Sequence, residues 1–299
     1  MTGAGLPFSW NPITDLRFMW SFAFMRNAFE AGTVIAIVAG IIGYFVILRH
    51  SAFATHALGH VGFAGAAGAV LFGVNPVFGL LLFTTTGATG MGILGRRAAH
   101  RDIEIGTVLA FMLGLGLFFL SLYAGYATLA YSILFGEILA IDSAGVLFTL
   151  EASLVVLAVV ALIGRRLLFA SLDEDVAEAK GLPMMGLGLT FMVLLAVAIS
   201  IAVQVIGVLL IFALMVTPAA VAVRLTRRPL HAVVLSVLVA LFATWTGLFI
   251  QFYSPYPASF FIVTIAFGIY VAVRVAQALM GWSVRRSQVQ PDAVAHIGS

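Results

Sequence analysis

The sequence predicts an all-α protein, a polytopic bundle of about eight or nine transmembrane helices, from two observations. Of its 299 residues, 63% are hydrophobic and only 9% are charged, whereas about 45–50% of the residues in soluble domains are apolar. The chain also divides into long apolar runs, and its mean hydropathy is +1.15. A helix needs about 20 apolar residues to cross a bilayer, and runs of that length recur.

Residues 1–30 are expected to form an interfacial segment that lies along the membrane before the first span. Aromatic residues such as Trp10 and Trp20 stand beside charged residues such as Arg17, and aromatic side chains favour the headgroup level. An additional half-span is the alternative. The start lacks the basic region and short apolar core of a cleaved secretion signal, so the first span is expected to direct insertion.

Residues 31–280 are expected to form the transmembrane domain. Its nine candidate spans are residues 31–48, 56–74, 76–95, 105–123, 143–164, 184–202, 203–223, 231–252 and 257–280. If these spans alternate in direction, the arginines at their ends gather on one side, which the positive-inside rule assigns to the cytoplasm. The polar residues 281–299 are then expected to be a disordered cytoplasmic tail.

Residues 124–142 are apolar, but counting them as a full span would break the arginine pattern. We expect a re-entrant or interfacial segment on the outer side, which could line a cavity because irregular backbone at membrane depth must be covered. Glu137 and Asp142 in this segment are candidates for a transport path, although solvation at a span boundary also explains them. Thr217 is a weaker candidate, since Pro218 beside it predicts a helix kink.

The densest charge falls in residues 165–183, between two apolar runs. This pattern predicts a water-exposed cytoplasmic connection that contains a short helix. Ser171 is expected to N-cap the helix, and Gly181 with Pro183 to end it. The helix dipole favours carboxylates in the first turn, which would hold Asp173, Glu174 and Asp175.

His56 and His60 are four residues apart and therefore share one face of a helix. Two imidazoles at this spacing can bind one zinc-class cation if carboxylate, hydroxyl or water completes the shell. Inward-facing packing or a place at the cytoplasmic interface is the alternative interpretation. The chain has no cysteine, which excludes disulfides and thiolate ligands.

Catalytic motifs are missing from the sequence. The single lysine, Lys180, does not belong to a Gly-x-x-x-x-Gly-Lys-Ser/Thr loop, so ATP cannot be held by that device. The chain also lacks a Gly-x-Ser-x-Gly elbow and a His-Glu-x-x-His helix. We therefore expect no enzyme activity and no tightly bound cofactor.

Three stretches resemble the membrane permeases of the ABC-3 family, which are bacterial importers of zinc, manganese and iron. Residues 55–65 (T-H-A-L-G-H-V-G-F-A-G) resemble the family's Gly-Asp-Ala-Leu-Ser-His-Ala motif, and residues 169–182 its cytoplasmic coupling segment. Residues 206–224 are similar to the family pattern Gly-x-Leu-Leu-x-x-Ala-Leu-Leu-x-x-Pro-Ala-Ala-x-Ala-Arg, which is the most specific match. The likeness in span order runs from about residue 28 to residue 280.

The resemblance implies a permease homodimer in the bacterial inner membrane, an extracytoplasmic metal-binding protein that delivers the ion, and a separate ATP-binding cassette ATPase. It implies no nucleic-acid partner. The ATPase would couple through the cytoplasmic segment, whose expected coupling residues are Ser171, Asp173, Glu174, Glu178 and Gly181.

The expected cargo is a divalent transition metal, zinc above manganese or iron. Where the family motif has aspartate and serine this chain has His56 and Gly59, and only His60 matches the family's histidine. Two imidazoles favour a borderline metal such as zinc over the harder manganese, although the same change could mean that the site has been altered or lost.

Two alternatives belong to other functional classes. The first is a secondary transporter or channel driven by an ion gradient, in which Glu137, Asp142, His56 and His60 would form the relay. Such a carrier would work alone in liposomes, whereas a permease needs its ATPase. The second is an intramembrane structural or assembly subunit, which would show no substrate-dependent change.

Overall fold

The computed structural model describes residues 12–94, 101–123, 132–136 and 138–279. These residues contain no β-strand, and the predicted all-α bundle is confirmed. Its helices are α1 (Pro12–Trp20), α2 (Ala23–Leu48), α3 (Ala52–Leu71), α4 (Pro76–Leu94), α5 (Arg101–Ser121), α7 (Ser143–Leu172), α8 (Glu174–Ala179), α9 (Met184–Ile206), α10 (Val208–Leu225), α11 (Pro229–Phe252) and α12 (Ala258–Leu279).

Seven apolar stretches of the described residues are long enough to cross a membrane. One of them, Met184–Leu225, contains both α9 and α10. Helix α3, with 20 residues, packs in the same bundle but is not among these stretches, so the predicted count of eight or nine spans is approximate. Helix α2 begins at Ala23 rather than at residue 31, because its first turns are buried against neighbouring helices.

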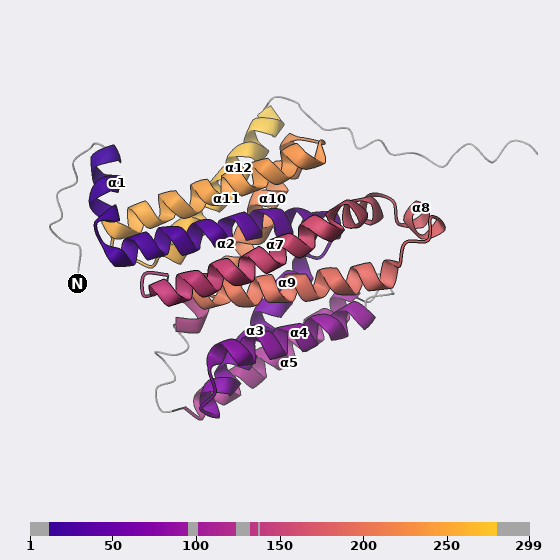
Figure 1. The fold of residues 1–299 in the computed structure, drawn as a ribbon, viewed down its shortest axis with the longest axis horizontal. Coiled ribbons are helices and arrows are strands. Elements are labelled where there is room, and N and C mark those ends of the chain that lie inside the picture. Colours follow the sequence, from indigo (N-terminus) through magenta and orange to yellow (C-terminus); the bar gives the residue numbers. More distant parts are fainter. Residues whose placement is uncertain (1–11, 95–100, 124–131, 137, 280–299) are drawn as a thin grey trace, which may run out of the picture.

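The bundle has two groups of helices, as Figure 1 shows. Helices α2, α7, α11 and α12 lie with α10 in the upper group, while α3, α4 and α5 pack together below. Helix α9 lies between the groups and contacts both α4 and α7. Helices α9 and α10 form the most deeply buried stretch of the described chain, and they make the core around which the other helices pack.

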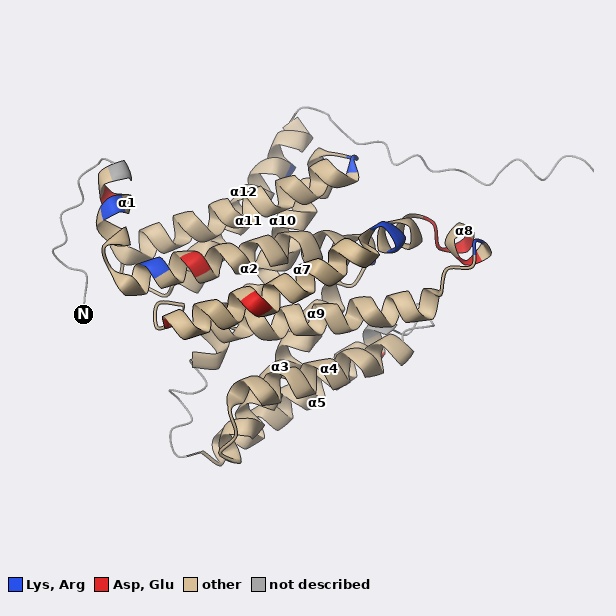
Figure 2. Ribbon diagram, in the orientation of Figure 1, with Lys and Arg blue, Asp and Glu red and all other residues tan. Residues whose placement is uncertain are grey.

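Charged residues give the bundle its orientation (Figure 2). The arginines near the end of α7 and the charged turn of α8 lie at one end of the bundle, and Arg227 and Arg228 precede α11 at the same end. The positive-inside rule predicts that this end faces the cytoplasm. The opposite end, with α1 and the start of α7, is called the outer end below.

Helices α3 and α4 approach most closely where Gly65 faces Gly79. A methyl group on either glycine would overlap the backbone of the other, so only glycine permits this crossing. In lipid, close contact through small residues is a principal source of helix association. Helix α4 is also joined to α9 by a 2.6 Å hydrogen bond between the hydroxyls of Thr84 and Ser200.

The outer segment, residues 132–136 and 138–142, packs against the break between α9 and α10. Gly136 and Gly207 have φ angles of +73° and +80°, and their backbones are in direct contact. The Ser259 hydroxyl donates to the Phe135 carbonyl at 2.6 Å. Protein therefore packs against the backbone at Phe135 and Gly136, whereas Glu137 lies outside the described residues.

Helix α1 folds over the outer end of α11. The Phe18 and Phe252 rings meet edge to face with centroids 6.1 Å apart, and the buried Asp15 carboxylate interacts with the side chain of Tyr253. Burial raises the pKa of Tyr253, and the negative charge of Asp15 raises it further. Aromatic and polar contacts together fix α1 to the bundle.

Candidate functional site

The two histidines lie next to each other on α3, as their spacing predicts. The ring centroids of His56 and His60 are 4.8 Å apart, and the ring planes are inclined by 83°. The Phe212 ring of α10 lies 5.1 Å from His56. Both imidazoles are half-buried, so they are accessible to a small ion while held by the surrounding helices.

His60 has a ring nitrogen available for coordination. Its Nδ1 is buried and makes no hydrogen bond to any described residue. A neutral imidazole nitrogen without a hydrogen is an acceptor and a metal ligand, and leaving such an atom buried without a partner is costly. An incoming cation would satisfy it, which fits a place on an ion path.

One chain supplies only part of a metal shell here. No group of three or more His, Cys, Asp or Glu side chains able to hold a metal occurs within the described ranges. Zinc in proteins is usually bound by four ligands. His56 and His60 therefore amount to half of such a shell.

A tight α2–α3 corner (residues 49–51) sets the direction of the helix that carries the histidines. His50 has a φ of +50°, and the Ser51 amide donates to the Val46 carbonyl at 2.9 Å. Both the amide and the hydroxyl of Thr55 donate to the Ser51 carbonyl at 3.0 Å. These bonds join the last turn of α2 to the first turn of α3.

Of the other predicted path residues, Asp142 forms no metal-ligand cluster with the histidine pair among the described residues. Asp142 is exposed and N-caps α7, where its Oδ1 accepts from the Gly145 amide at 2.8 Å. Thr217 is half-buried on α10 beside Pro218, which lies inside that helix. Capping explains Asp142, while Glu137 lies outside the described residues.

The start of the predicted cytoplasmic helix needs a correction. Asp173, not Ser171, is the N-cap of α8, and its Oδ1 accepts from the Val176 amide at 3.0 Å. Helix α7 continues to Leu172, so Ser171 is still helical and its hydroxyl donates to the Leu167 carbonyl at 2.6 Å. The chain becomes extended only at Asp173, where a cap must stand.

The end of α8 is as predicted. Gly181 has a φ of +77°, and the Leu182 amide donates to the Ala177 carbonyl at 3.2 Å, a pairing that closes helices at glycine. The Lys180 ammonium lies 5.1 Å from the centre of the Phe169 ring. Helix α8 is thereby held against the end of α7, and it projects beyond the neighbouring helices (Figure 1).

The projecting helix exposes its carboxylates. Asp173, Glu174 and Glu178 are exposed, whereas Ala177 is completely buried against the bundle. One face of α8 is therefore anchored, and the opposite face is free to meet a partner. This arrangement suits a docking element.

Arg49 is a contact residue that the sequence marked only as a topological arginine. It is the C-cap of α2, and its Nη1 is 3.5 Å from the Ser171 hydroxyl of α7. Its guanidinium carbon lies 5.5 Å from the centre of the Phe191 ring of α9. Sequence spacing cannot reveal a contact between residues so far apart in the chain.

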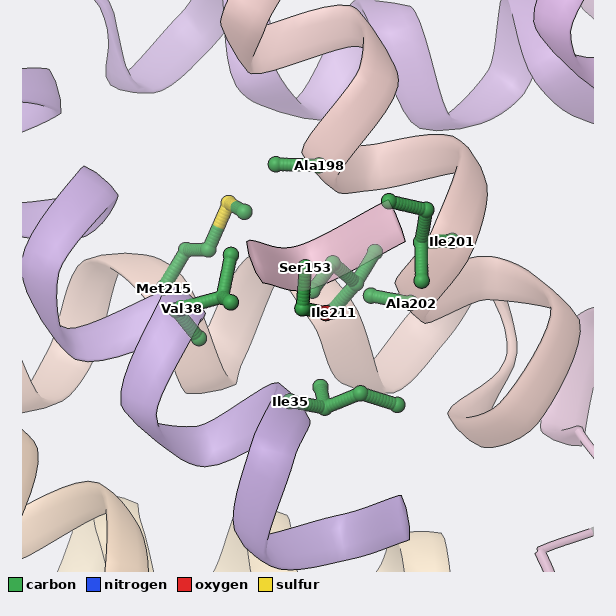
Figure 3. Close-up of a pocket in the computed structure, with 9 residues that line it drawn as sticks. Ile35, Val38, Ser153, Ala198, Ile201, Ala202, Ile211 and Met215 are labelled. Atoms are coloured by element: carbon green, nitrogen blue, oxygen red, sulfur yellow. The ribbon is translucent and has the colours of Figure 1, made fainter. Parts of the chain in front are cut away.

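A small crevice in the core is shown in Figure 3. Ser153 of α7 faces aliphatic side chains of α2, α9 and α10, and its hydroxyl has no hydrogen-bond partner among the described residues. The crevice leaves no room for a water molecule. The crevice is a dry packing defect, and its lining residues are Ile35, Val38, Ala39, Ser153, Ala198, Ile201, Ala202, Ile211 and Met215.

Comparisons with known proteins agree with this architecture. The manganese transport system membrane protein MntC of Listeria monocytogenes is 32% identical over 222 residues, which cover 74% of this chain and 79% of the relative. The manganese import system permease protein ScaB of Streptococcus gordonii is 31% identical over 232 residues, or 77% and 83% of the two chains.

Solved structures show the same fold. PsaBC from Streptococcus pneumoniae, in complex with Fab, aligns with a TM-score of 0.79 at 28% identity, covering 90% of this chain and 99% of that chain. A metal-chelate type ABC transporter in an inward-facing conformation aligns with a TM-score of 0.67 at 15% identity, which supports the fold alone. The model of the ABC 3 transport family matches residues 21–277, and the chain therefore belongs to this family.

Proposed function

We propose that this chain is the transmembrane subunit of an ATP-driven importer of divalent transition metal ions, with zinc as the preferred cargo. A separate ATPase would hydrolyse ATP, and this chain would provide the path. The adjacent imidazoles of His56 and His60, within a permease of this family, are the observation that carries the proposal. The family assignment also favours a permease over the gradient-driven carrier.

The metal preference rests on the ligand type. Two imidazoles suit zinc, whereas manganese favours carboxylate and other oxygen ligands. The names of the relatives favour manganese instead, since MntC and ScaB are both described as manganese systems. Manganese is therefore the second candidate.

A second copy of this chain would complete the ligand shell. Two chains that meet near α3 would bring four imidazoles together, the coordination number that zinc prefers. The half-buried state of both histidines in one chain leaves them accessible to such a partner. We propose a homodimer for this reason, with an extracytoplasmic binding protein delivering the ion.

Helix α8 is the proposed docking element for the ATPase. Its exposed carboxylates, Glu174 and Glu178, and its anchored face would let closure of the ATPase move the ends of α7 and α9. Alternating access would follow, with the path open first to one side and then to the other. Gly207 between α9 and α10 and Pro218 within α10 are the places where the helices can bend.

The test is uptake of radioactive zinc and manganese into proteoliposomes that contain this chain, with and without its ATPase and ATP. We expect uptake to require both the ATPase and ATP, and to fall at least about tenfold in His60→Ala. Thr217→Ala is a comparison variant on a different helix and should change uptake less.

Three outcomes would change the proposal. Uptake by the chain alone under an ion gradient would replace it with the secondary carrier. ATP-dependent uptake of manganese but not zinc would keep the importer and overturn the metal preference. Undiminished uptake in His60→Ala would mean that this histidine is not part of the metal path.

A further inference from the structure

We propose that Arg49 is a positioning residue that transmits movement of the coupling helix α8 to the histidine-bearing helix α3. The inference rests on the proposed function, because it assumes that an ATPase acts on α8. It adds a residue outside the predicted coupling segment and names the route by which that segment would reach the metal path.

The first step is the contact between Arg49 and the two helices that flank α8. Its Nη1 lies 3.5 Å from the Ser171 hydroxyl, two residues before the N-cap of α8. The guanidinium also lies over the Phe191 ring of α9, at 5.5 Å from its centre. A single half-buried side chain thus touches the helix before α8 and the helix after it.

The second step is the packing of the guanidinium on α9. A methyl group added at Gly188 would lie 3.4 Å from Arg49 Nη2, which is ordinary van der Waals contact. The plane of an arginine can stack on an aromatic ring while its N–H groups donate hydrogen bonds, and a lysine cannot reproduce both contacts. The chemistry of the site therefore calls for arginine specifically.

The third step leads from α8 to Arg49. The Asp173 cap and the Gly181 closure fix α8, and the Lys180 ammonium over the Phe169 ring fixes the turn after it to α7. Ala177 is fully buried under the helix. A push on α8 would therefore move the end of α7, including Ser171, instead of being absorbed in a loose loop.

The last step leads from Arg49 to the histidines. Arg49 is the C-cap of α2 and the first residue of the α2–α3 corner. The Ser51 hydroxyl donates to the Arg49 carbonyl at 3.1 Å, and the Ser51 carbonyl holds the amide and hydroxyl of Thr55. Since His56 follows Thr55 directly, displacement of Arg49 would reorient the start of α3.

The experiment uses the full chain with its ATPase in proteoliposomes, and measures ATP hydrolysis and metal uptake in the same preparation. We expect Arg49→Ala to retain hydrolysis while uptake per ATP falls about tenfold. Arg49→Lys, which keeps the charge, should recover only part of the loss. The matched control is Arg227→Ala, an exposed cytoplasmic arginine in the turn before α11, which should leave the ratio unchanged.

A double-mutant cycle tests the contact itself. If Arg49 acts through Ser171, adding Ser171→Ala to Arg49→Ala should cause little further loss, whereas independent effects would multiply. If Arg49→Ala takes up as much metal per ATP hydrolysed as wild type does, the proposal is overturned. If wild type itself shows no ATP-dependent uptake, the proposed function fails first, so the two failures are distinguishable.

A distance measurement covers the case in which Arg49→Ala assembles poorly. The chain has no cysteine, so spin labels can be placed on Asp175→Cys in α8 and on Phe72→Cys beyond the outer end of α3, both exposed positions. In wild type and Arg49→Lys, ATP should shift this distance, with a smaller shift in Arg49→Lys. A shift in Arg49→Lys as large as that in wild type would contradict the proposed link.

Discussion

Gly136 and Gly207 lie backbone to backbone, so that a methyl group on either would overlap main-chain atoms of the other. Both residues have positive φ angles, which glycine adopts without a steric penalty. This contact fixes the outer segment to the break between α9 and α10. The positive φ angle and the lack of room for a side chain therefore each require glycine at both positions.

We predict that Gly207→Ala destabilises the protein. Gly207 has φ 80° and ψ 166°, a region that only glycine readily enters, and strain of this kind costs about 1–3 kcal/mol. The overlap with Gly136 adds to that cost. Gly73→Ala is the control, because Gly73 has φ +70° but no atom lies within 4 Å of an added methyl group.

Thermal unfolding of the purified variants in detergent measures both effects. Gly73→Ala should lower the melting temperature slightly and Gly207→Ala considerably more. Equal shifts would mean that backbone conformation alone, without the contact to Gly136, determines the effect.

We predict opposite effects from two buried serines. Ser153→Ala removes a buried hydroxyl that has no partner among the described residues, and should stabilise by about 1 kcal/mol. Ser200→Ala breaks the 2.6 Å hydrogen bond to Thr84 and should destabilise by about 1 kcal/mol. Chemical denaturation compares the two variants, and destabilisation by Ser153→Ala would show that its hydroxyl has a partner.

We predict that His56→Asp changes the metal preference. The substitution restores the carboxylate that stands at this position in the resembled motif, and oxygen ligands suit manganese better than imidazole does. The ratio of manganese to zinc uptake should rise about tenfold. His56→Asn is the matched variant, because asparagine has the shape of aspartate but no charge. An unchanged ratio of manganese to zinc uptake in His56→Asp would mean that this residue does not select the metal.

We predict that Asp173→Ala weakens binding of the ATPase. Loss of an N-cap costs about 0.5–2 kcal/mol, and α8 has only six residues in which to absorb it. Asp175→Ala is the control, since Asp175 is an exposed carboxylate of the first turn and is not the cap. Co-purification with the ATPase should decline in the first variant and remain near wild type in the second.

We predict that docking of α1 weakens in strong alkali. Burial and Asp15 raise the pKa of Tyr253 above the usual value of a tyrosine, about 10, so the folded protein favours the protonated phenol. Its contribution is complete below about pH 10 and is lost as the pH rises through the raised pKa. Limited proteolysis of the α1 region should show this alkaline step in wild type but not in Tyr253→Phe.

The span pattern was predictable because each membrane helix must be long and apolar whatever it packs against. The division of the 42-residue stretch Met184–Leu225 was harder to place. Apolar composition is uniform across it, and the expected boundary at residue 203 lies within α9. The break depends on the φ angle of Gly207 and its contact with Gly136, and neither is visible in hydropathy.

The histidine pair was predictable for a similar reason, since a spacing of four residues fixes a shared helix face. Its surroundings were not, because Phe212 comes from a helix more than 150 residues away in the chain. The cap of α8 was predicted wrongly because Ser171 and Asp173 are both good N-cap residues. Which of the two caps α8 depends on how far α7 extends. The sequence does not show that α7 continues to Leu172 or that Arg49 contacts its last turn.

The single-residue connection at Gly207 has a practical consequence for experiments on the intact protein. Helices α9 and α10 have no loop between them that could be cut by a protease or lengthened by an inserted epitope. Tags that report the outer surface belong instead in the turn at residues 72–75 or in residues 253–257. Because Gly207 alone joins them, the two most buried helices can change the angle between their axes, but their adjoining ends cannot separate.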